Sequence, residues 1–282
     1  MTIKLIQEKY LNDLNDIYPR EEINSFFYML CQSYLNKNRL DIALEPAFEL
    51  TAHSEAAFLK ALNALKKEYP IQYIIGKTEF MELPFEVNDQ VLIPRPETEE
   101  LISWIIASHL EDEPPSVLDI GTGSGCIAIV LAKQLSKSKI DAIDVSEQAL
   151  EVAKRNAARN NIDINFIKTD ILDGKELTNI YDIIVSNPPY VRESEKQQMH
   201  TNVLKYEPDL ALFVSDNDPL LYYRHIAKLA LNGLRPKGSL YFEINQYLGK
   251  DLQDLLETLG FEKIELKKDI YGADRMIRAV KN

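Results

Sequence analysis

The first 75 residues place apolar side chains at three- and four-residue steps, a spacing that predicts helices. The two clearest stripes consist of Ile23, Phe26, Phe27, Leu30, Tyr34 and Leu35, and of Phe58, Ala61, Leu62 and Leu65. We expect Ser54 to cap the second of these helices and Pro70 to end it. The pattern therefore predicts a helical domain over residues 1–75, and none of its side chains suggests catalysis.

The pattern becomes strand-like over residues 76–94. Apolar positions on either side of Asn88-Asp89 predict a β-hairpin that turns there and links two domains. An apolar helix is expected next, with Pro96 in its first turn and glutamates at the positive end of its dipole.

From Val117 onward, short buried strands alternate with helices. Strands are expected at residues 117–120, 140–143, 164–167, 181–186 and 239–244. Such alternation predicts right-handed βαβ units and a mainly parallel sheet. Two closing strands, 261–267 and 275–280, are too close in sequence for a crossover and should pair antiparallel. The fold class is therefore α/β, with a sheet domain over residues 95–282.

Charge and composition limit the classes of partner and the compartment that we expect for this protein. The chain has 282 residues and a net charge of −12. This acidity opposes phosphate binding and disfavours a nucleic-acid partner. The two cysteines, Cys31 and Cys126, form neither a disulfide framework nor a zinc motif and suit a reducing compartment. Without a signal-peptide pattern or an apolar run of about 20 residues, we expect a cytoplasmic protein that binds no membrane.

A glycine-rich loop follows the first strand of the predicted sheet. It reads Gly121-Thr122-Gly123-Ser124-Gly125, and glycine lets the backbone turn tightly and approach a ligand closely. The spacing differs from the dinucleotide-binding fingerprint, and the lysine of a P-loop is missing. The loop indicates ligand binding, although an ordinary tight turn would have the same composition.

Acidic residues follow the next two strands. Asp144 comes about 20 residues after the loop, a distance that suits hydrogen bonds to ribose hydroxyls. It could instead be an acid at a helix N-terminus beside Ser146. After the third strand, a base could rest on Ile171 while Asp170 accepts from its amine; both could equally be ordinary loop residues.

The fourth strand ends in Ser186-Asn187-Pro188-Pro189-Tyr190, the most specific motif in the chain. Because proline has no N–H, the carbonyls of Asn187 and Pro188 stay available as acceptors. The Asn187 side chain adds an acceptor, and Tyr190 is expected to form an aromatic wall. This set suits a planar group that bears an NH₂, whereas a plain proline-rich turn is the alternative.

Together, the glycine loop, Asp144 and N-P-P-Y resemble class I S-adenosyl-L-methionine-dependent methyltransferases that act on amino groups. The segment I-P-R-P-E-T-E at residues 93–99 narrows the resemblance to the HemK/PrmC family of protein glutamine N5-methyltransferases. Further matching stretches lie at residues 70–76, 207–212 and 268–275. The resemblance covers nearly the whole chain and implies a Rossmann-like sheet domain and S-adenosyl-L-methionine as cofactor. It also implies, as substrate, the glutamine of the Gly-Gly-Gln loop in peptide-chain release factors.

These motifs define the expected site. The cofactor is expected to contact Gly121, Thr122, Gly123, Ser124, Gly125, Asp144, Asp170, Ile171 and Asn187, and the catalytic residues are expected to be Asn187, Pro188, Pro189 and Tyr190. Neither His nor Glu adjoins the motif, and we expect no general base and no metal. The family commonly has glycine where this chain has Asn245; since Asn tolerates positive φ, we expect only the turn to change.

Several alternatives remain at this stage. A DNA or RNA amino-methyltransferase, acting for example on adenine N6, would also hold a planar NH₂, but the net charge of −12 counts against it. A cofactor-binding protein without catalysis is disfavoured by the intact N-P-P-Y. The sheet domain does not distinguish a release-factor methyltransferase from one that acts on a ribosomal-protein glutamine. We expect the helical domain to choose the substrate, and the protein to be a monomer.

Overall fold

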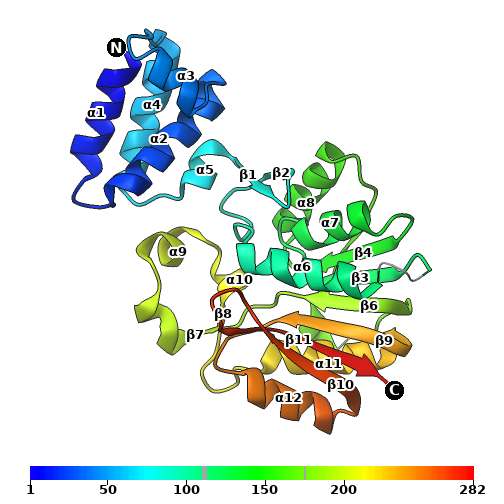
Figure 1. Ribbon diagram of the computed structural model, residues 1–282. Coiled ribbons are helices and arrows are strands. Elements are labelled where there is room, and N and C mark those ends of the chain that lie inside the picture. The colour runs from blue at the N-terminus through cyan, green and yellow to red at the C-terminus, as the bar shows by residue number, and fades with distance from the viewer. Residues whose placement is uncertain (110–112, 175) are drawn as a thin grey trace. The chain divides into compact units, whose positions relative to one another are not determined.

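The computed structural model describes residues 1–109, 113–174 and 176–282, and they form two compact units (Figure 1). The first unit combines Met1–Gly76 with His200–Tyr206, and the second combines Lys77–Met199 with Glu207–Asn282. No pattern in the sequence predicts that a segment near residue 200 joins the N-terminal helices.

The first unit is entirely helical, as the periodicity predicts. Its helices are α1 (Ile3–Leu14), α2 (Arg20–Leu35), α3 (Arg39–Leu44), α4 (Ala52–Leu65), α5 (Ile71–Ile75) and α9 (Thr201–Tyr206). Fully buried Tyr10, Phe27 and Phe58 fill its core, and the Tyr10 hydroxyl donates to the Phe58 carbonyl at 2.6 Å. The tyrosine thus contributes apolar area while its one polar atom is satisfied.

Two expected helix boundaries in this unit are wrong. Thr51, not Ser54, caps α4: its Oγ1 accepts from the Ser54 N–H at 3.1 Å. Ser54 lies inside the first turn, where it is buried. Pro70 does not end α4, which stops at Leu65, but immediately precedes α5. Proline suits that place because its missing N–H would have no helical partner there.

Helix α9 belongs to this unit through two contacts of Tyr206. Its hydroxyl donates to the Lys67 carbonyl at 2.7 Å, and its ring meets that of Tyr69 edge-on with 4.8 Å between centroids. Along the sequence, the chain therefore returns to the first unit after strands β3 (Ser116–Ile120) to β6 (Tyr181–Ser186) of the sheet.

The hairpin forms earlier in the chain than expected. Strands β1 (Lys77–Phe80) and β2 (Leu83–Glu86) pair antiparallel around Met81 and Glu82, both at positive φ. Phe80 and Phe85 pack together in the core with ring centroids 6.0 Å apart. Their burial determines the pairing, whereas Asn88 makes a local turn in which its side chain accepts from the Gln90 N–H.

The second unit is built on a seven-stranded sheet of order β10-β11-β9-β6-β3-β4-β5. Only β11 runs antiparallel to its neighbours, which confirms the expected α/β class with an antiparallel closing strand. The strands are β3 (Ser116–Ile120), β4 (Lys139–Asp144), β5 (Asn165–Lys168), β6 (Tyr181–Ser186), β9 (Leu234–Glu243), β10 (Phe261–Lys268) and β11 (Asp274–Lys281).

Helices cover both faces of this sheet (Figure 1). One face packs against α6 (Pro96–His109), α7 (Cys126–Gln134) and α8 (Glu147–Arg159), and the other against α11 (Leu221–Gly233) and α12 (Gly249–Thr258). Strand residues alternate between the two cores: Val117 faces the first and Leu118 the second. Burial on both faces explains why the central strands β3 and β6 are mostly apolar, whereas the edge strands β5 and β10 are largely exposed.

Short elements complete the unit. They are the 3₁₀ helices η1 (Ile171–Asp173) and η2 (Glu193–Gln198), helix α10 (Asp209–Leu212), and the parallel strand pair β7 (Val191–Arg192) and β8 (Phe213–Val214). Among the described residues, no helix is both long and apolar enough to cross a membrane.

Candidate active site

A cavity of about 350 Å³ opens at the carboxyl ends of β3, β4 and β6. The register aligns these ends, because Ile120 pairs with Ile143 on one side and with Ser186 on the other. Parallel strands of open α/β sheets present their ligands at this edge. Most of the expected site residues line the cavity: Gly121, Thr122, Gly123, Ser124, Asp144, Asp170, Ile171, Asn187, Pro188 and Pro189.

The three loop glycines have two different roles. Gly121 and Gly123 lie at positive φ, and a Cβ on either would meet no atom within 4 Å, so their backbone faces open space at the cavity. A Cβ on Gly125 would instead lie 3.1 Å from Ala153 Cβ. Gly125 is not among the cavity-lining residues, contrary to expectation. Its missing side chain lets α7 and α8 approach each other.

Asp144 connects the two neighbouring loops. Its Oδ2 accepts from the Gly123 N–H and its Oδ1 from the Ser146 N–H, both at 2.9 Å. Burial raises the pKa of this carboxyl, and the hydrogen bonds from Ser146 and Gly123 oppose the rise. Asp144 therefore shapes the glycine loop while it lines the cavity.

Asp170 and Ile171 enter the cavity wall from the end of β5. The Asp170 side chain caps η1 by accepting from the Leu172 N–H at 2.9 Å. This cap orders the turn that carries Ile171 and Leu172, and both of these apolar residues line the cavity.

Asn187 begins a chain of hydrogen bonds that leads away from the cavity. Its Nδ2 donates to Thr98 Oγ1 at 3.3 Å, and Thr98 Oγ1 donates to Glu243 Oε2 at 2.6 Å. The Tyr190 hydroxyl donates to the other oxygen of Glu243 at 3.0 Å. Tyr190 is therefore turned toward Glu243 and is not among the cavity-lining residues, so the expected aromatic wall is not found at this cavity.

Glu243 is a nearby carboxylate that the motif did not reveal. It is almost fully buried at the end of β9, and burial raises its pKa. Hydrogen bonds from Thr98 and Tyr190, and the positive charge of Arg275, act in the opposite direction. The expectation that no glutamate is close to Asn187 therefore holds along the sequence but not in space.

Two of the matching sequence stretches meet at a partly buried ion pair, in which Glu207 is the buried partner. Glu207 accepts from the Arg95 guanidinium at 2.5 Å and from the Ile93 N–H at 3.2 Å. This pair ties the segment before α6 to the segment before α10. The sequence motifs did not indicate several lining residues that lie just before α6 or within α6, α10 and α11: Arg95, Thr98, Leu210, Ala211, Tyr222 and Ile226. The resemblance to I-P-R-P-E-T-E was the available signal for the first two.

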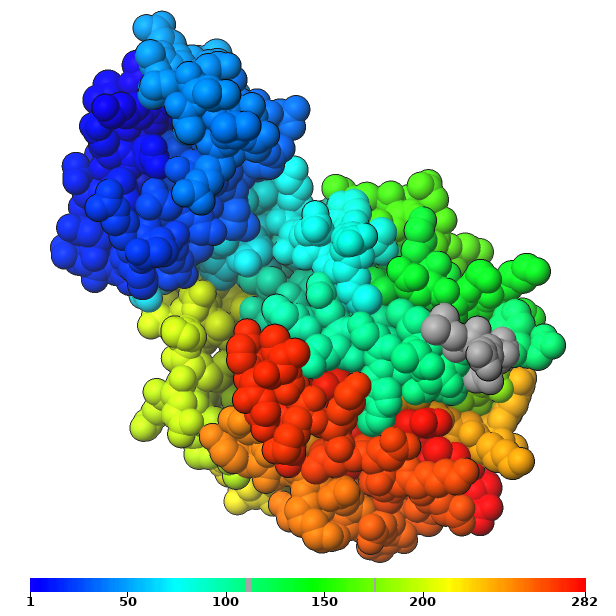
Figure 2. Space-filling view, in the orientation of Figure 1, coloured from blue at the N-terminus to red at the C-terminus, as the bar shows by residue number. Residues whose placement is uncertain are grey.

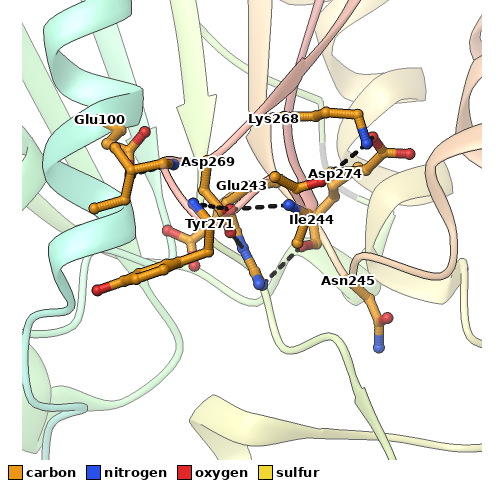
Figure 3. A network of polar contacts seen from close by, with 12 residues as sticks. Glu100, Glu243, Ile244, Asn245, Lys268, Asp269, Tyr271 and Asp274 are labelled. Carbon is orange, nitrogen blue, oxygen red and sulfur yellow. Dashed lines mark hydrogen bonds and ion pairs between the residues drawn. The ribbon is translucent and has the colours of Figure 1, made fainter.

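Asp269 orders the turn between β10 and β11, and Figure 3 shows its contacts. Its carboxylate accepts from the N–H groups of Tyr271 and Ala273, both at 3.0 Å, and from Arg275 Nε at 3.1 Å. The turn protrudes beside α6 (Figure 2), where the Ile270 N–H donates to Glu100. Tyr271 is 81% exposed, so the network holds an aromatic side chain toward solvent.

Asn245 acts through its side chain rather than through an unusual backbone. It does not adopt a positive φ, contrary to what its replacement of glycine suggested. Its Nδ2 donates to the Tyr190 carbonyl at 3.0 Å and to Glu195 Oε2 at 2.8 Å. Asn245 thus joins the end of β9 to the segment after N-P-P-Y.

Within the described part of the chain, no group of three or more His, Cys, Asp or Glu side chains could hold a metal ion.

Comparisons with known proteins agree with this geometry. Family models described as PrmC N-terminal domain and Methyltransferase small domain match residues 9–76 and 101–208. The release factor glutamine methyltransferase of Flavobacterium psychrophilum is 51% identical, with 99% of each chain covered. That of Bacteroides thetaiotaomicron is 46% identical over 94% of this chain and 95% of its own. A solved methyltransferase from Pyrococcus furiosus superimposes with a TM-score of 0.54 at 20% identity, covering 82% of this chain and all of that one.

The fold is that of a class I methyltransferase, a class of enzymes that uses S-adenosyl-L-methionine. More narrowly, the chain belongs to the family of release factor glutamine methyltransferases, which confirms the resemblance inferred from its motifs.

Proposed function

We propose that this enzyme methylates the side-chain nitrogen N5 of the glutamine in the Gly-Gly-Gln loop of peptide-chain release factors. The observation that carries the proposal is the placement of Asn187 and Pro188 in the wall of the same cavity as the glycine loop. The family names of its relatives support a release factor as the substrate.

The residues fit the cofactor. S-adenosyl-L-methionine supplies a methyl group on a positively charged sulfur. Gly121 and Gly123 leave open space for it, since no side chain occupies the place where a Cβ would point. Asp144 would accept hydrogen bonds from the ribose hydroxyls, and Ile171 and Asp170 would hold the adenine by its face and its amine.

Asn187 and Pro188 would act on the substrate amide. An amide nitrogen is a poor nucleophile because its lone pair is delocalised, and it gains positive charge when alkylated. Acceptors directed at its two hydrogens therefore stabilise the transition state more than the ground state. The Asn187 side chain and the Pro188 carbonyl are the acceptors we assign, and Pro189 provides no competing N–H donor.

The reaction needs no strong general base from the protein. An N-alkylated amide cation is acidic and loses its proton to water. Glu243 reaches Asn187 only through Thr98, so it is not positioned to take the proton directly. Tyr190, which was expected among the catalytic residues, is assigned an indirect role through Glu243.

Recognition of the protein substrate is assigned to the helical unit and the hairpin, which would grip the release factor outside its reacting loop. This proposal includes a cytoplasmic enzyme, because its substrate works on ribosomes, and it takes the enzyme to be a monomer. The acidic net charge suits a protein substrate better than a nucleic acid.

Mass spectrometry of the release-factor Gly-Gly-Gln peptide tests the proposal. Purified release factor is incubated with cofactor, with and without the enzyme, beside a ribosomal-protein substrate and an adenine-containing oligonucleotide. A gain of one methyl group on the glutamine, dependent on the enzyme, is the expected result. Methylation of either of the other substrates instead would contradict it.

A further inference from the structure

Thr98 connects the side chain of Asn187 to a buried carboxylate. The contacts are short and run in sequence: Asn187 Nδ2 to Thr98 Oγ1 at 3.3 Å, then Thr98 Oγ1 to Glu243 Oε2 at 2.6 Å. Thr98 is 3% exposed and Glu243 is 1% exposed, so water does not compete for these atoms.

The donors and acceptors of these hydrogen bonds can be assigned from the chemistry of the groups. In its ionised form the Glu243 carboxylate only accepts hydrogen bonds, so the single hydroxyl proton of Thr98 then points to Glu243. The lone pairs of Thr98 Oγ1 that remain can only accept. The amide end of Asn187 that faces Thr98 must therefore be the NH₂ group. This leaves Oδ1, the acceptor, on the opposite side of an amide that lines the cavity.

Glu243 is itself held in place. The Tyr190 hydroxyl donates to its Oε1 at 3.0 Å. Burial raises the pKa of Glu243, and the hydrogen bonds from Thr98 and Tyr190 together with the positive charge of Arg275 favour its charged form. Arg275 in turn donates to Asp269 and to the Ile244 carbonyl. The carboxylate thus has donors at both oxygens and a positive charge nearby, which offsets part of its desolvation.

We infer that Thr98 and Glu243 are positioning residues that set the orientation of the Asn187 amide, so that its oxygen rather than its NH₂ meets the substrate. This inference rests on the proposed function, in which Asn187 Oδ1 accepts from the glutamine NH₂. A reversed amide would present a donor to a donor and would repel the substrate nitrogen.

The test compares Thr98→Val with Thr98→Ser in the full-length enzyme. Valine keeps the shape of threonine but removes the hydroxyl, whereas serine keeps the hydroxyl. Thr258→Val, on the exposed end of α12, is the matched control for the chemical change. For each protein, kcat and KM for release factor and the cofactor Kd by calorimetry are measured.

We expect Thr98→Val to lower kcat by about 10–100-fold, the loss typical when a contact that orients a reactive group is removed. The cofactor Kd should stay within about twofold, and Thr98→Ser and Thr258→Val should stay within about threefold of the parent kcat. The inference is overturned if Thr98→Val retains the parent kcat, or if Thr98→Ser falls as far as Thr98→Val.

A second variant covers the case in which Thr98→Val does not fold. In Glu243→Gln the new amide can donate to Thr98 as well as accept from it, so Thr98 no longer has to donate to position 243 and the Asn187 amide can take either orientation. We expect kcat to fall while the cofactor still binds. An unchanged kcat would overturn the inference. A parent enzyme that leaves release factor unmethylated would contradict the proposed function instead, so the two failures are distinguishable.

Discussion

Asn156 pairs with the peptide group of Glu86 as a neighbouring strand would. Its Oδ1 accepts from the Glu86 N–H at 2.6 Å, and its Nδ2 donates to the Glu86 carbonyl at 3.0 Å. The same Nδ2 donates to the Ser124 carbonyl in the glycine loop at 2.9 Å. The fully buried side chain of Asn156, on α8, therefore joins the hairpin to the glycine loop.

Asn156→Ala should lower the free energy of unfolding by about 2–3 kcal/mol, because buried backbone groups lose their partners. The cofactor should also bind more weakly, since the loop loses an anchor. Urea unfolding and calorimetry measure both effects. Asn165→Ala, at an exposed site, is the control and should stay within about 0.5 kcal/mol. Equal stability of the two variants would contradict the role of Asn156.

Asn187→Ala should reduce methylation of release factor by at least about 100-fold, as the loss of a transition-state contact does. Calorimetry should show cofactor affinity near that of the parent. Near-normal turnover of the purified variant would be incompatible with the assigned mechanism.

Asp144→Ala should weaken cofactor binding by about 10–100-fold, the effect of losing hydrogen bonds to a charged acceptor. Burial raises the pKa of Asp144, so this carboxylate becomes protonated at a higher pH than an ordinary aspartate. As the pH is lowered, the affinity of the parent enzyme for the cofactor should therefore begin to fall earlier. Asp163→Ala, on an exposed residue, is the control. If calorimetry found the same affinity in the parent and in Asp144→Ala, the ribose assignment would fail.

Asp119 should make stability depend on pH. Burial raises the pKa of this fully buried carboxyl from 3.8 to about 7. Between these values the folded protein holds a proton that the unfolded chain has released, so stability falls as pH rises from 4 to 7, by at most about 1.4 kcal/mol per unit. Asp119→Asn should remove this slope in urea unfolding. A parallel slope in both proteins would exclude Asp119 as its source.

Removing residues 1–75 should raise KM for intact release factor by at least about 10-fold while the cofactor Kd changes little. A short Gly-Gly-Gln peptide provides the control, because it is too small to use a contact outside the reacting loop. The truncated and full-length enzymes should therefore share one KM for the peptide. Equal KM values for the intact factor would refute the recognition role.

Local patterns predicted the central strands of the sheet, because burial on both faces leaves apolar runs in the sequence. Most of the residues that these patterns assigned to the site do line the cavity. They failed where contacts join distant positions. Thr98 and Glu243 lie 145 positions apart, and no local spacing pairs them. The hairpin shows a second limit: Asn88-Asp89 is good turn chemistry, but the burial of Phe80 and Phe85 decides the strand pairing.

Helix α9 imposes an order on how the protein is made. Domains tend to fold as they leave the ribosome, N-terminal part first. Here the N-terminal unit lacks its last helix until residue 206 has been synthesised, after β6 and the N-P-P-Y motif. The first unit to emerge therefore cannot be completed until strands β3 to β6 of the second unit have been synthesised.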